Sequence, residues 1–203
     1  MVSLITLTAF VPAALALNVT PGADMMFCLG QGLRSGPGAA WAASAGIAVG
    51  AMVHGAIAGA GVGALIASLP GSFEIIRWIG VAYLLWLAVQ TITSRTSPAA
   101  APKSAARHAF RAGLMVNLSN PKVILFVLAF VPQFVNPQAG SVLGQFLIFG
   151  AVLALGGFVV NGMVGVFAGR LSARLVGAAG PLGWITGGIY TTLALRLALM
   201  ERG

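Results

Sequence analysis

The sequence predicts an all-α membrane protein with six transmembrane helices arranged as two inverted three-helix repeats, the first and fourth helices being broken. Three observations support this fold class. Of the 203 residues, 59% are hydrophobic and 7% are charged, whereas a soluble domain carries roughly a quarter charged residues. Hydrophobic runs long enough to cross a bilayer recur along the chain. Two of these runs contain a proline in a polar setting, and similar motifs occur in both halves.

The first predicted span is interrupted by a short polar segment. Residues 3–17 are apolar, residues 18–24 read Asn-Val-Thr-Pro-Gly-Ala-Asp, and residues 25–29 are apolar again. Pro21 removes a backbone donor and clashes with the preceding turn of a helix, so we expect the helix to break there. Met1 to Ser3 lack the positively charged region that opens a signal peptide, so we interpret the whole segment as one interrupted span.

The rest of the first half contains two continuous spans and ends in a basic loop. Residues 41–69 carry no charge, with His54 as their one strongly polar side chain, and residues 78–93 form a shorter third span. Residues 94–111 are rich in Ala, Ser and Pro, so we expect a loop. This loop divides the single transmembrane domain into a first repeat at about residues 1–93, a linker at about residues 94–112 and a second repeat at about residues 113–203.

The fourth span, residues 113–135, contains a second polar interruption, Asn117-Leu-Ser-Asn-Pro-Lys122. The apolar residues that follow it make only about 20 Å of helix, whereas the bilayer core is about 30 Å thick. A spanning helix must therefore reach back to about Gly113, which places Lys122 near mid-depth. A lysine at that depth costs several kcal/mol unless it faces protein or water, so it indicates a functional site. The structural alternative is a kinked helix whose Lys122 extends to the membrane interface.

The second half continues with two further spans. Residues 141–168 form the fifth span and residues 182–200 form the sixth, with a short basic loop between them. Basic residues favour the cytoplasmic side of a membrane. If the central loop is cytoplasmic, seven Lys and Arg residues lie on that side: Arg34, Arg95, Lys103, Arg107, Arg111, Arg170 and Arg174. We therefore expect a cytoplasmic central loop and two non-cytoplasmic termini.

Matching motifs recur in the same order in the two halves. Three pairs of residues correspond, at offsets of 100, 107 and 107 positions: Pro21 and Pro121, His54 and Asn161, Tyr83 and Tyr190. Because each half has three spans, the two halves cross the membrane in opposite directions. This is the inverted-repeat plan of secondary transporters, in which paired interrupted helices mark the substrate site.

The polar interruptions of the first and fourth predicted spans also contain motifs typical of a protein family. They are Thr20-Pro-Gly-Ala-Asp-Met25 and Asn117-Leu-Ser-Asn-Pro-Lys122, the second being followed by Phe126, Phe130 and Pro132-Gln-Phe134. These motifs resemble the lysine exporter and homoserine/threonine exporter family (LysE/RhtB type), which usually has a second proline at the position of Ala23. The resemblance covers the whole chain. It implies export of amino acids or related small metabolites across a bacterial inner (plasma) membrane, driven by proton antiport.

The residue types at the interruptions suit an amino acid, which is a zwitterion. Lys122 and the helix N-terminus opened by Pro121 can bind the carboxylate, whereas Asp24 and the carbonyls of residues 18–20 can bind the ammonium. Asp24 is also a candidate proton site, because burial favours a neutral carboxyl and a nearby lysine favours a charged one. The predicted substrate and ion site comprises Asn18, Thr20, Pro21, Gly22, Asp24, Asn117, Asn120, Pro121 and Lys122. The alternative is a structural pair of Asp24 and Lys122 that neutralise each other.

Four further side chains are candidates for a gate or a proton relay: His54, Asn161, Tyr83 and Tyr190. Histidine titrates near neutral pH, and a buried tyrosine hydroxyl needs a partner. Hydrogen bonds between helices are the structural alternative for His54 and Asn161.

Glycines at spacings of four predict a close-packing face on the second span. Gly46 and Gly50, then Gly55, Gly59 and Gly63, recur in this way, a pattern typical of tight helix packing. We expect this face to press against the broken helices. A homodimer interface or a sliding surface is the alternative use.

Other functional classes find little support. The chain has neither a His-Glu-x-x-His nor a Cys-x-x-Cys motif, so we expect no enzyme, no cofactor and no metal site. The net charge of +8 comes from basic residues between hydrophobic runs without aromatic interleaving, so we expect no nucleic-acid partner. The expected partners are an amino acid, protons and the lipid bilayer. The alternatives are a small-cation or metal exporter with Asp24 as ligand, and a non-transporting membrane interaction protein.

Overall fold

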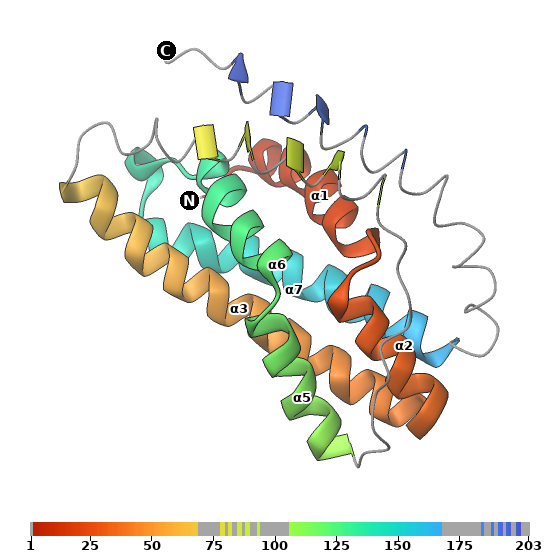
Figure 1. Cartoon of the computed structure of the whole chain (residues 1–203). Helices are drawn as coiled ribbons and strands as arrows, with labels where there is room; N and C mark the ends of the chain where they lie inside the picture. Colours follow the sequence, from red (N-terminus) through yellow and green to blue (C-terminus); the bar gives the residue numbers. More distant parts are fainter. Residues whose placement is uncertain are drawn as a thin grey trace.

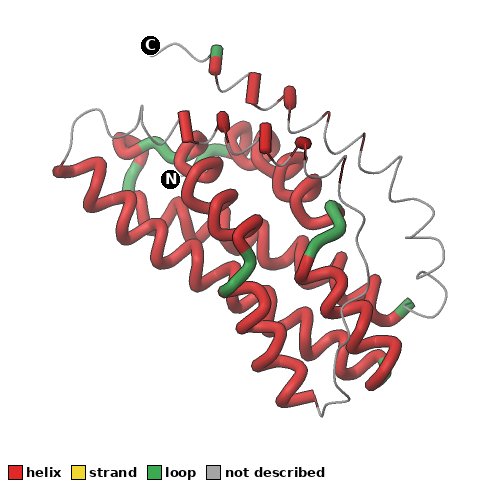
Figure 2. Tube along the Cα trace, in the orientation of Figure 1, coloured by secondary structure: helices red, strands yellow, loops and turns green. Residues whose placement is uncertain are grey.

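The computed structural model describes residues 2–68 and 106–167, together with isolated positions between residues 78 and 93 and between residues 184 and 199. These residues are helical apart from short turns and loops, and they contain no strand, as the sequence predicts (Figure 1; Figure 2). Most of the third and sixth predicted spans lies outside the described residues. Tyr83 and Tyr190 are among the residues that are not described.

The first broken helix consists of α1 (Leu4–Val19) and α2 (Ala23–Ser35), which are bent by 52° relative to each other. The Ser3 side chain caps the start of α1 by accepting a hydrogen bond from the Thr6 backbone N–H. α1 ends just before Pro21, which cannot continue the hydrogen-bond ladder. α2 then begins after Gly22 and ends at Gly36, whose positive φ of 84° favours glycine.

The second broken helix consists of α5 (Ala106–Leu118) and α6 (Pro121–Leu125), and α6 continues into η1 (Phe126–Phe130), a turn of π-helix, and η2 (Val131–Phe134), a 3-10 turn. The two arms are again bent by 52°. The loop assignment of residues 106–112 is wrong, because α5 begins at Ala106 rather than near Gly113. Alanine and arginine both favour helix, and Ala109 is fully buried, so these residues extend the helix despite their charge.

The unbroken helices are α3 (Pro37–Ser68) and α7 (Val142–Val166), and η3 (Pro137–Ala139) is a single turn before α7. Within the described residues, two helices are long and apolar enough to cross a membrane, and the number rises to four if each bent pair is one span. The six spans and their inverted repeat therefore stay predictions. In Figure 1 the first bent pair runs downward from α1 to α2, whereas the second runs upward from α5 to α6. Figure 2 shows both breaks near mid-height.

Glycines bring α3 close to its neighbours. A Cβ on Gly46 would overlap the Phe110 carbonyl of α5, and a Cβ on Gly50 would lie 2.5 Å from the Asn117 Oδ1 atom. This confirms the predicted packing on a broken helix for Gly46 and Gly50, but not for Gly55, whose Cβ would lie 3.3 Å from the Phe146 carbonyl of α7. Gly59 faces α7 instead, where its Cβ would lie 2.8 Å from the Phe146 Cβ. α3 thus packs against both α5 and α7, and glycine permits the close approach.

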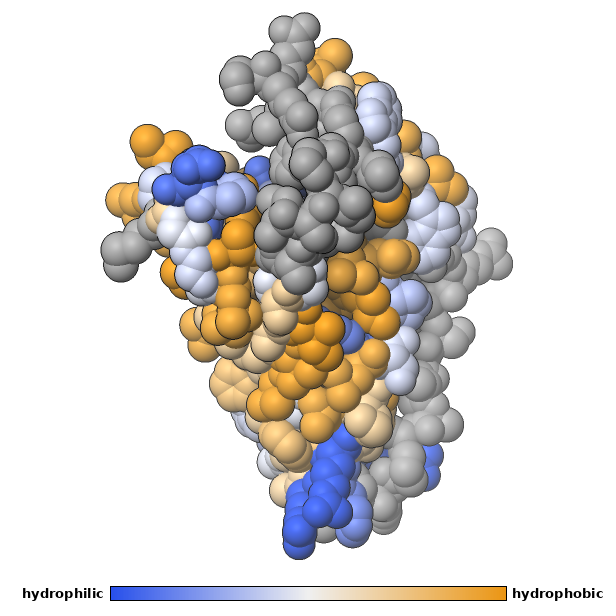
Figure 3. All heavy atoms as spheres, turned by 90° about the vertical axis from the view of Figure 1, so that its left-hand side faces the viewer, coloured by the Kyte–Doolittle hydropathy of each residue, from blue (hydrophilic) through white to orange (hydrophobic). Residues whose placement is uncertain are grey.

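An aromatic cluster fills the core beside the second break. Its rings have centroids 4.8 to 6.5 Å apart, a spacing typical of favourable aromatic pairs. The members are Phe10, Phe126, Phe130, Phe134 and Phe149. Outside, apolar side chains cover the middle of the face in Figure 3, and strongly hydrophilic ones gather toward its ends. Such a distribution suits a protein surrounded by lipid.

Candidate functional site

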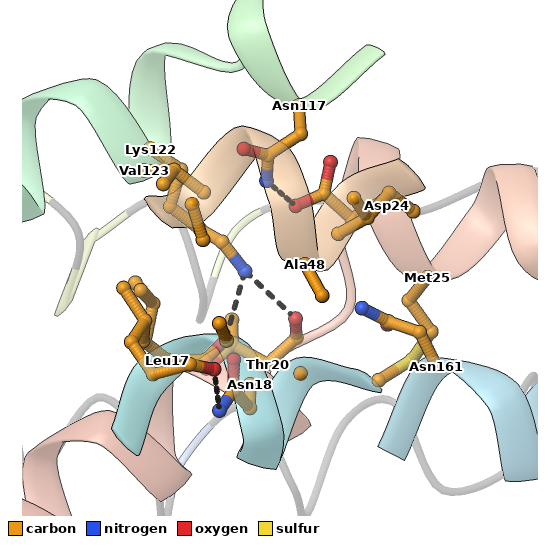
Figure 4. Close-up of a pocket in the computed structure, with 15 residues that line it drawn as sticks. Leu17, Asn18, Thr20, Asp24, Met25, Ala48, Asn117, Lys122, Val123 and Asn161 are labelled. Atoms are coloured by element: carbon orange, nitrogen blue, oxygen red, sulfur yellow. Dashed lines mark hydrogen bonds between the residues drawn. The ribbon is translucent and has the colours of Figure 1, made fainter. Parts of the chain in front are cut away.

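The two breaks meet at a small, partly open cavity. Its free space is about 20 Å³, which holds about one water molecule. Among the described residues that line it, Asp24 and Lys122 are the charged ones (Figure 4). The lining comes from both broken helices, α3 and α7: Leu17, Asn18, Thr20, Asp24, Met25, Ile47, Ala48, Ala51, Asn117, Lys122, Val123, Leu153, Ala154, Gly157 and Asn161.

At each break, the proline leaves one backbone carbonyl of the preceding helix without its usual N–H donor. In an α-helix a carbonyl accepts from the N–H four residues later, and proline has no N–H. Pro21 therefore cannot serve the Leu17 carbonyl, and Pro121 cannot serve the Asn117 carbonyl. A buried carbonyl without a donor is unfavourable, so both atoms need partners from elsewhere in the structure.

Lys122 supplies the partner at the first break. Its Nζ atom donates to the Leu17 carbonyl at 2.9 Å and to the Thr20 carbonyl at 3.0 Å (Figure 4). Gly22 makes room for the ammonium group, since a Cβ at this position would lie 3.2 Å from Nζ. The carbonyls at the C-terminal end of α1 also carry the negative end of its dipole, which favours a cation there. We call the Leu17 and Thr20 carbonyls the carbonyl cradle.

Asp24 lies across the cavity, in the first turn of α2, with 8% of its surface exposed. Its Oδ2 atom accepts a hydrogen bond of 2.8 Å from Asn117 Nδ2, which joins the two broken helices (Figure 4). The other carboxylate oxygen, Oδ1, is buried without a hydrogen-bond partner among the described residues. The positive N-terminal end of α2 favours a carboxylate at this position.

His54 holds the released carbonyl of the second break. Its Nε2 atom lies 3.2 Å from the Asn117 carbonyl and donates to it. The Asn120 backbone N–H donates to the same carbonyl at 2.9 Å. His54 therefore reaches the cavity through Asn117 and does not line it. This interhelical hydrogen bond is the structural alternative that the sequence offered for His54.

Asn120 and Asn18 fix the backbone on either side of the cavity. The Asn120 side chain caps α6 by accepting from the Lys122 backbone N–H at 3.0 Å, so the first free N–H of this helix already has a partner. Asn18 donates from Nδ2 to the Leu153 carbonyl of α7 at 3.2 Å. Asn161 lines the cavity beside it.

The structure thus brings most of the predicted site residues together. Asn18, Thr20, Asp24, Asn117, Lys122 and Asn161 line the cavity, while Pro21, Gly22, Asn120 and Pro121 form the breaks. Sequence reasoning missed the Leu17 carbonyl, although its position four residues before Pro21 would have revealed it. It also missed the aliphatic lining, which carries no polar signal. The described residues hold no group of three or more His, Cys, Asp or Glu side chains that could bind a metal.

Broken helices that enclose a polar cavity are typical of secondary transporters, and comparison with known proteins identifies the class. Residues 15–201 match the family of LysE type translocators, and the chain belongs to this family. The resemblance seen in the two interruptions is therefore confirmed. The chain is a translocator of a membrane family and not an enzyme, as expected.

Several relatives are named efflux proteins. A homoserine/homoserine lactone efflux protein of Salmonella typhimurium is 31% identical over 172 residues, which cover 83% of each chain. A leucine efflux protein of an Enterobacter species is 30% identical over 200 residues, which cover 95% of this chain and 94% of the relative. An uncharacterized membrane protein of Vibrio cholerae is 32% identical over 145 residues, 70% of each chain. No solved structure shows a significant match.

Proposed function

We propose that this chain exports amino acids or related small metabolites across a bacterial inner membrane by proton antiport. One observation carries the proposal: a carboxylate and an ammonium group from different broken helices face one small cavity inside the helix bundle. Burying either charge is costly, and the pair adds little net stability. Such a pair is therefore better explained by a zwitterionic ligand and a proton than by stability alone. The names of the relatives, which include leucine and homoserine efflux proteins, support the same substrate class.

The roles follow from the charges. Lys122 attracts the carboxylate of the amino acid, because its ammonium is the cation at the cavity. Asp24 carries the exchanged proton, since its Oδ1 atom is buried without a hydrogen-bond partner among the described residues. The protonation of a carboxyl inside a protein depends on the charges near it, so it changes when a charged ligand arrives or leaves.

The cavity must enlarge during transport. About 20 Å³ holds a water molecule but no amino acid. In secondary transporters, alternating access arises when one repeat moves against the other around a fixed site. The glycines of α3 bring it into close contact with α5 and α7, and we place such a movement at these contacts.

The same proposal includes six helices in two inverted repeats, a cytoplasmic central loop and two non-cytoplasmic termini. The opposite directions of the bent pairs in Figure 1 support it. So do two similar contacts: Gly50 of α3 lies against the Asn117 side chain, and Gly157 of α7 lies against the Asn18 side chain. These glycines are separated by the same 107 positions as His54 and Asn161.

Efflux measurements test the proposal directly. Cells expressing the chain should release one or more radiolabelled amino acids faster than control cells, and proteoliposomes should show saturable counterflow that a pH gradient accelerates. Lys122→Ala should weaken the binding of carboxylate-bearing substrates, so its half-saturating concentration should rise. Unchanged affinity would remove Lys122 from substrate binding. Absence of saturable transport for every amino acid would refute the proposed function, and dependence on a metal ion would favour a cation exporter.

A further inference from the structure

The carbonyl cradle already holds an ammonium group. Lys122 Nζ makes hydrogen bonds of 2.9 and 3.0 Å to the Leu17 and Thr20 carbonyls. Leu17 lies in the last turn of α1 and Thr20 is its C-cap, so both acceptors lie where the helix dipole adds negative potential. The cradle is therefore a built site for a primary ammonium, with the acceptors placed by Pro21 and the space provided by Gly22.

An amino acid carries the same chemical group. Its α-ammonium has three N–H donors, as the lysine ammonium has. The cavity beside the cradle has about 20 Å³ of free space, so a substrate cannot bind there while the lysine side chain remains in place. Lysine has a flexible four-carbon stem, and its Nζ atom is the part of the lining that can withdraw with the least disturbance to the backbone.

We propose that the carbonyl cradle is the subsite for the substrate's α-ammonium, and that Lys122 occupies it in the absence of substrate. The inference rests on the proposed function and assigns one group of the substrate to named atoms. On binding, the substrate's carboxylate draws Lys122 Nζ out of the cradle, and the α-ammonium takes over the two carbonyls. The buried acceptors are then satisfied in both states. Asp24, held by Asn117, is left for the proton.

This exchange predicts that a substrate needs both of its charges. An amine without a carboxylate meets a cradle occupied by a like charge and gives Lys122 no new partner. A carboxylic acid without an amine draws Lys122 away but leaves two buried carbonyls unpaired, which is unfavourable. We therefore expect the unmodified carrier to reject both compounds.

The test uses a fragment that replaces the missing side chain. Lys122→Ala removes Cγ, Cδ, Cε and Nζ, which together have the heavy atoms of n-propylammonium. The full chain is purified in detergent as wild type, Lys122→Ala and Lys122→Met, and its Tm is followed by tryptophan fluorescence. Each protein is titrated with n-propylammonium chloride, with sodium chloride of equal ionic strength, or with 1-propanol. Methionine serves as the matched control because it fills the space without a charge.

The expected result is a saturable rise in Tm for Lys122→Ala with n-propylammonium only, and no rise for wild type or Lys122→Met. A folded Lys122→Ala protein that shows no rise, or equal rises in all three proteins, would overturn the inference. If folded Lys122→Ala protein is obtained only when n-propylammonium is present throughout purification, that result would also support the inference. The assay needs no transport, so a chain that exports no amino acid but binds the fragment refutes the proposed function alone.

Gly22→Ala provides a second test that keeps Lys122. The added methyl group would lie 3.2 Å from Nζ and crowd the cradle. The extended backbone at Gly22, with a φ of −165°, accepts any residue. We expect the KM for the exported amino acid to rise several-fold. Gly38→Ala is the control, because a Cβ there meets nothing within 4 Å. An unchanged KM in Gly22→Ala would contradict the assignment.

Discussion

In both breaks a proline leaves a backbone carbonyl without its helical donor, but a different side chain binds that carbonyl in each break. Each contains a proline that releases the carbonyl four residues before it, and each bent pair has an angle of 52°. In both cases a basic side chain from the other bent pair or from α3 binds the released carbonyl. Lys122 binds the Leu17 carbonyl, and His54 binds the Asn117 carbonyl. The breaks are thus made by proline and stabilised from outside their own helices.

The two breaks differ in the further contacts of these two carbonyls. The Asn117 carbonyl also accepts from the Asn120 N–H, and its histidine partner sits behind the cavity on α3. The Leu17 carbonyl faces the cavity and shares its ammonium partner with the Thr20 carbonyl. The second break is therefore held firmly, whereas the first depends on a side chain that can move. Under the proposed function, the carbonyls of the first break bind the ammonium of the ligand, and Lys122 of the second break binds its carboxylate.

Replacing Asp24 should have the largest effect on transport, and it tests the difference between the two breaks. Position 124, which corresponds to Asp24 at the offset of the prolines, is isoleucine, so the acid belongs to the first break alone. Asp24→Asn keeps an oxygen for the Asn117 donor but cannot bind or release a proton. We expect pH-driven efflux from proteoliposomes to fall to the level of vesicles without protein, while substrate exchange without a gradient continues. Full pH-driven efflux by this variant would remove Asp24 from the coupling mechanism.

The sequence predicted the breaks and the polar lining well, because proline, asparagine, aspartate and lysine stand out in an apolar chain. It was less informative wherever the backbone makes the contact. The Leu17 carbonyl has no residue-type signal, and only its position four residues before Pro21 identifies it. The early start of α5 was hidden because Arg107 and Arg111 are equally typical of loops. The direction in which Gly59 faces depends on where α7 lies, which no local pattern contains.

Gly50→Ala tests the second break through its packing and should have an intermediate effect. The new Cβ would lie 2.5 Å from Asn117 Oδ1 and 2.9 Å from Asn117 Cβ, so the asparagine must shift, which disturbs its hydrogen bond to Asp24. Overpacking of this kind costs about 1–3 kcal/mol. We expect a lower Tm in detergent and slower efflux. Gly61→Ala is the matched control on the same helix, because its Cβ would meet nothing within 4 Å. Equal behaviour of the two variants would show that Asn117 has room to move.

Substitution of His54 should have the smallest effect on Tm and efflux. Two substitutions distinguish a structural role of this histidine from a proton relay. His54→Ala removes one of two donors to the Asn117 carbonyl, and a single hydrogen bond contributes about 1 kcal/mol. We expect a modest fall in Tm with efflux largely retained, because the Asn120 N–H still serves the carbonyl. His54→Gln can donate a hydrogen bond but cannot titrate, so it should restore the Tm and leave the pH dependence of efflux unchanged. A relay would instead make both variants equally defective in pH-driven efflux at normal stability, and the second break would then take part in proton movement as directly as the first.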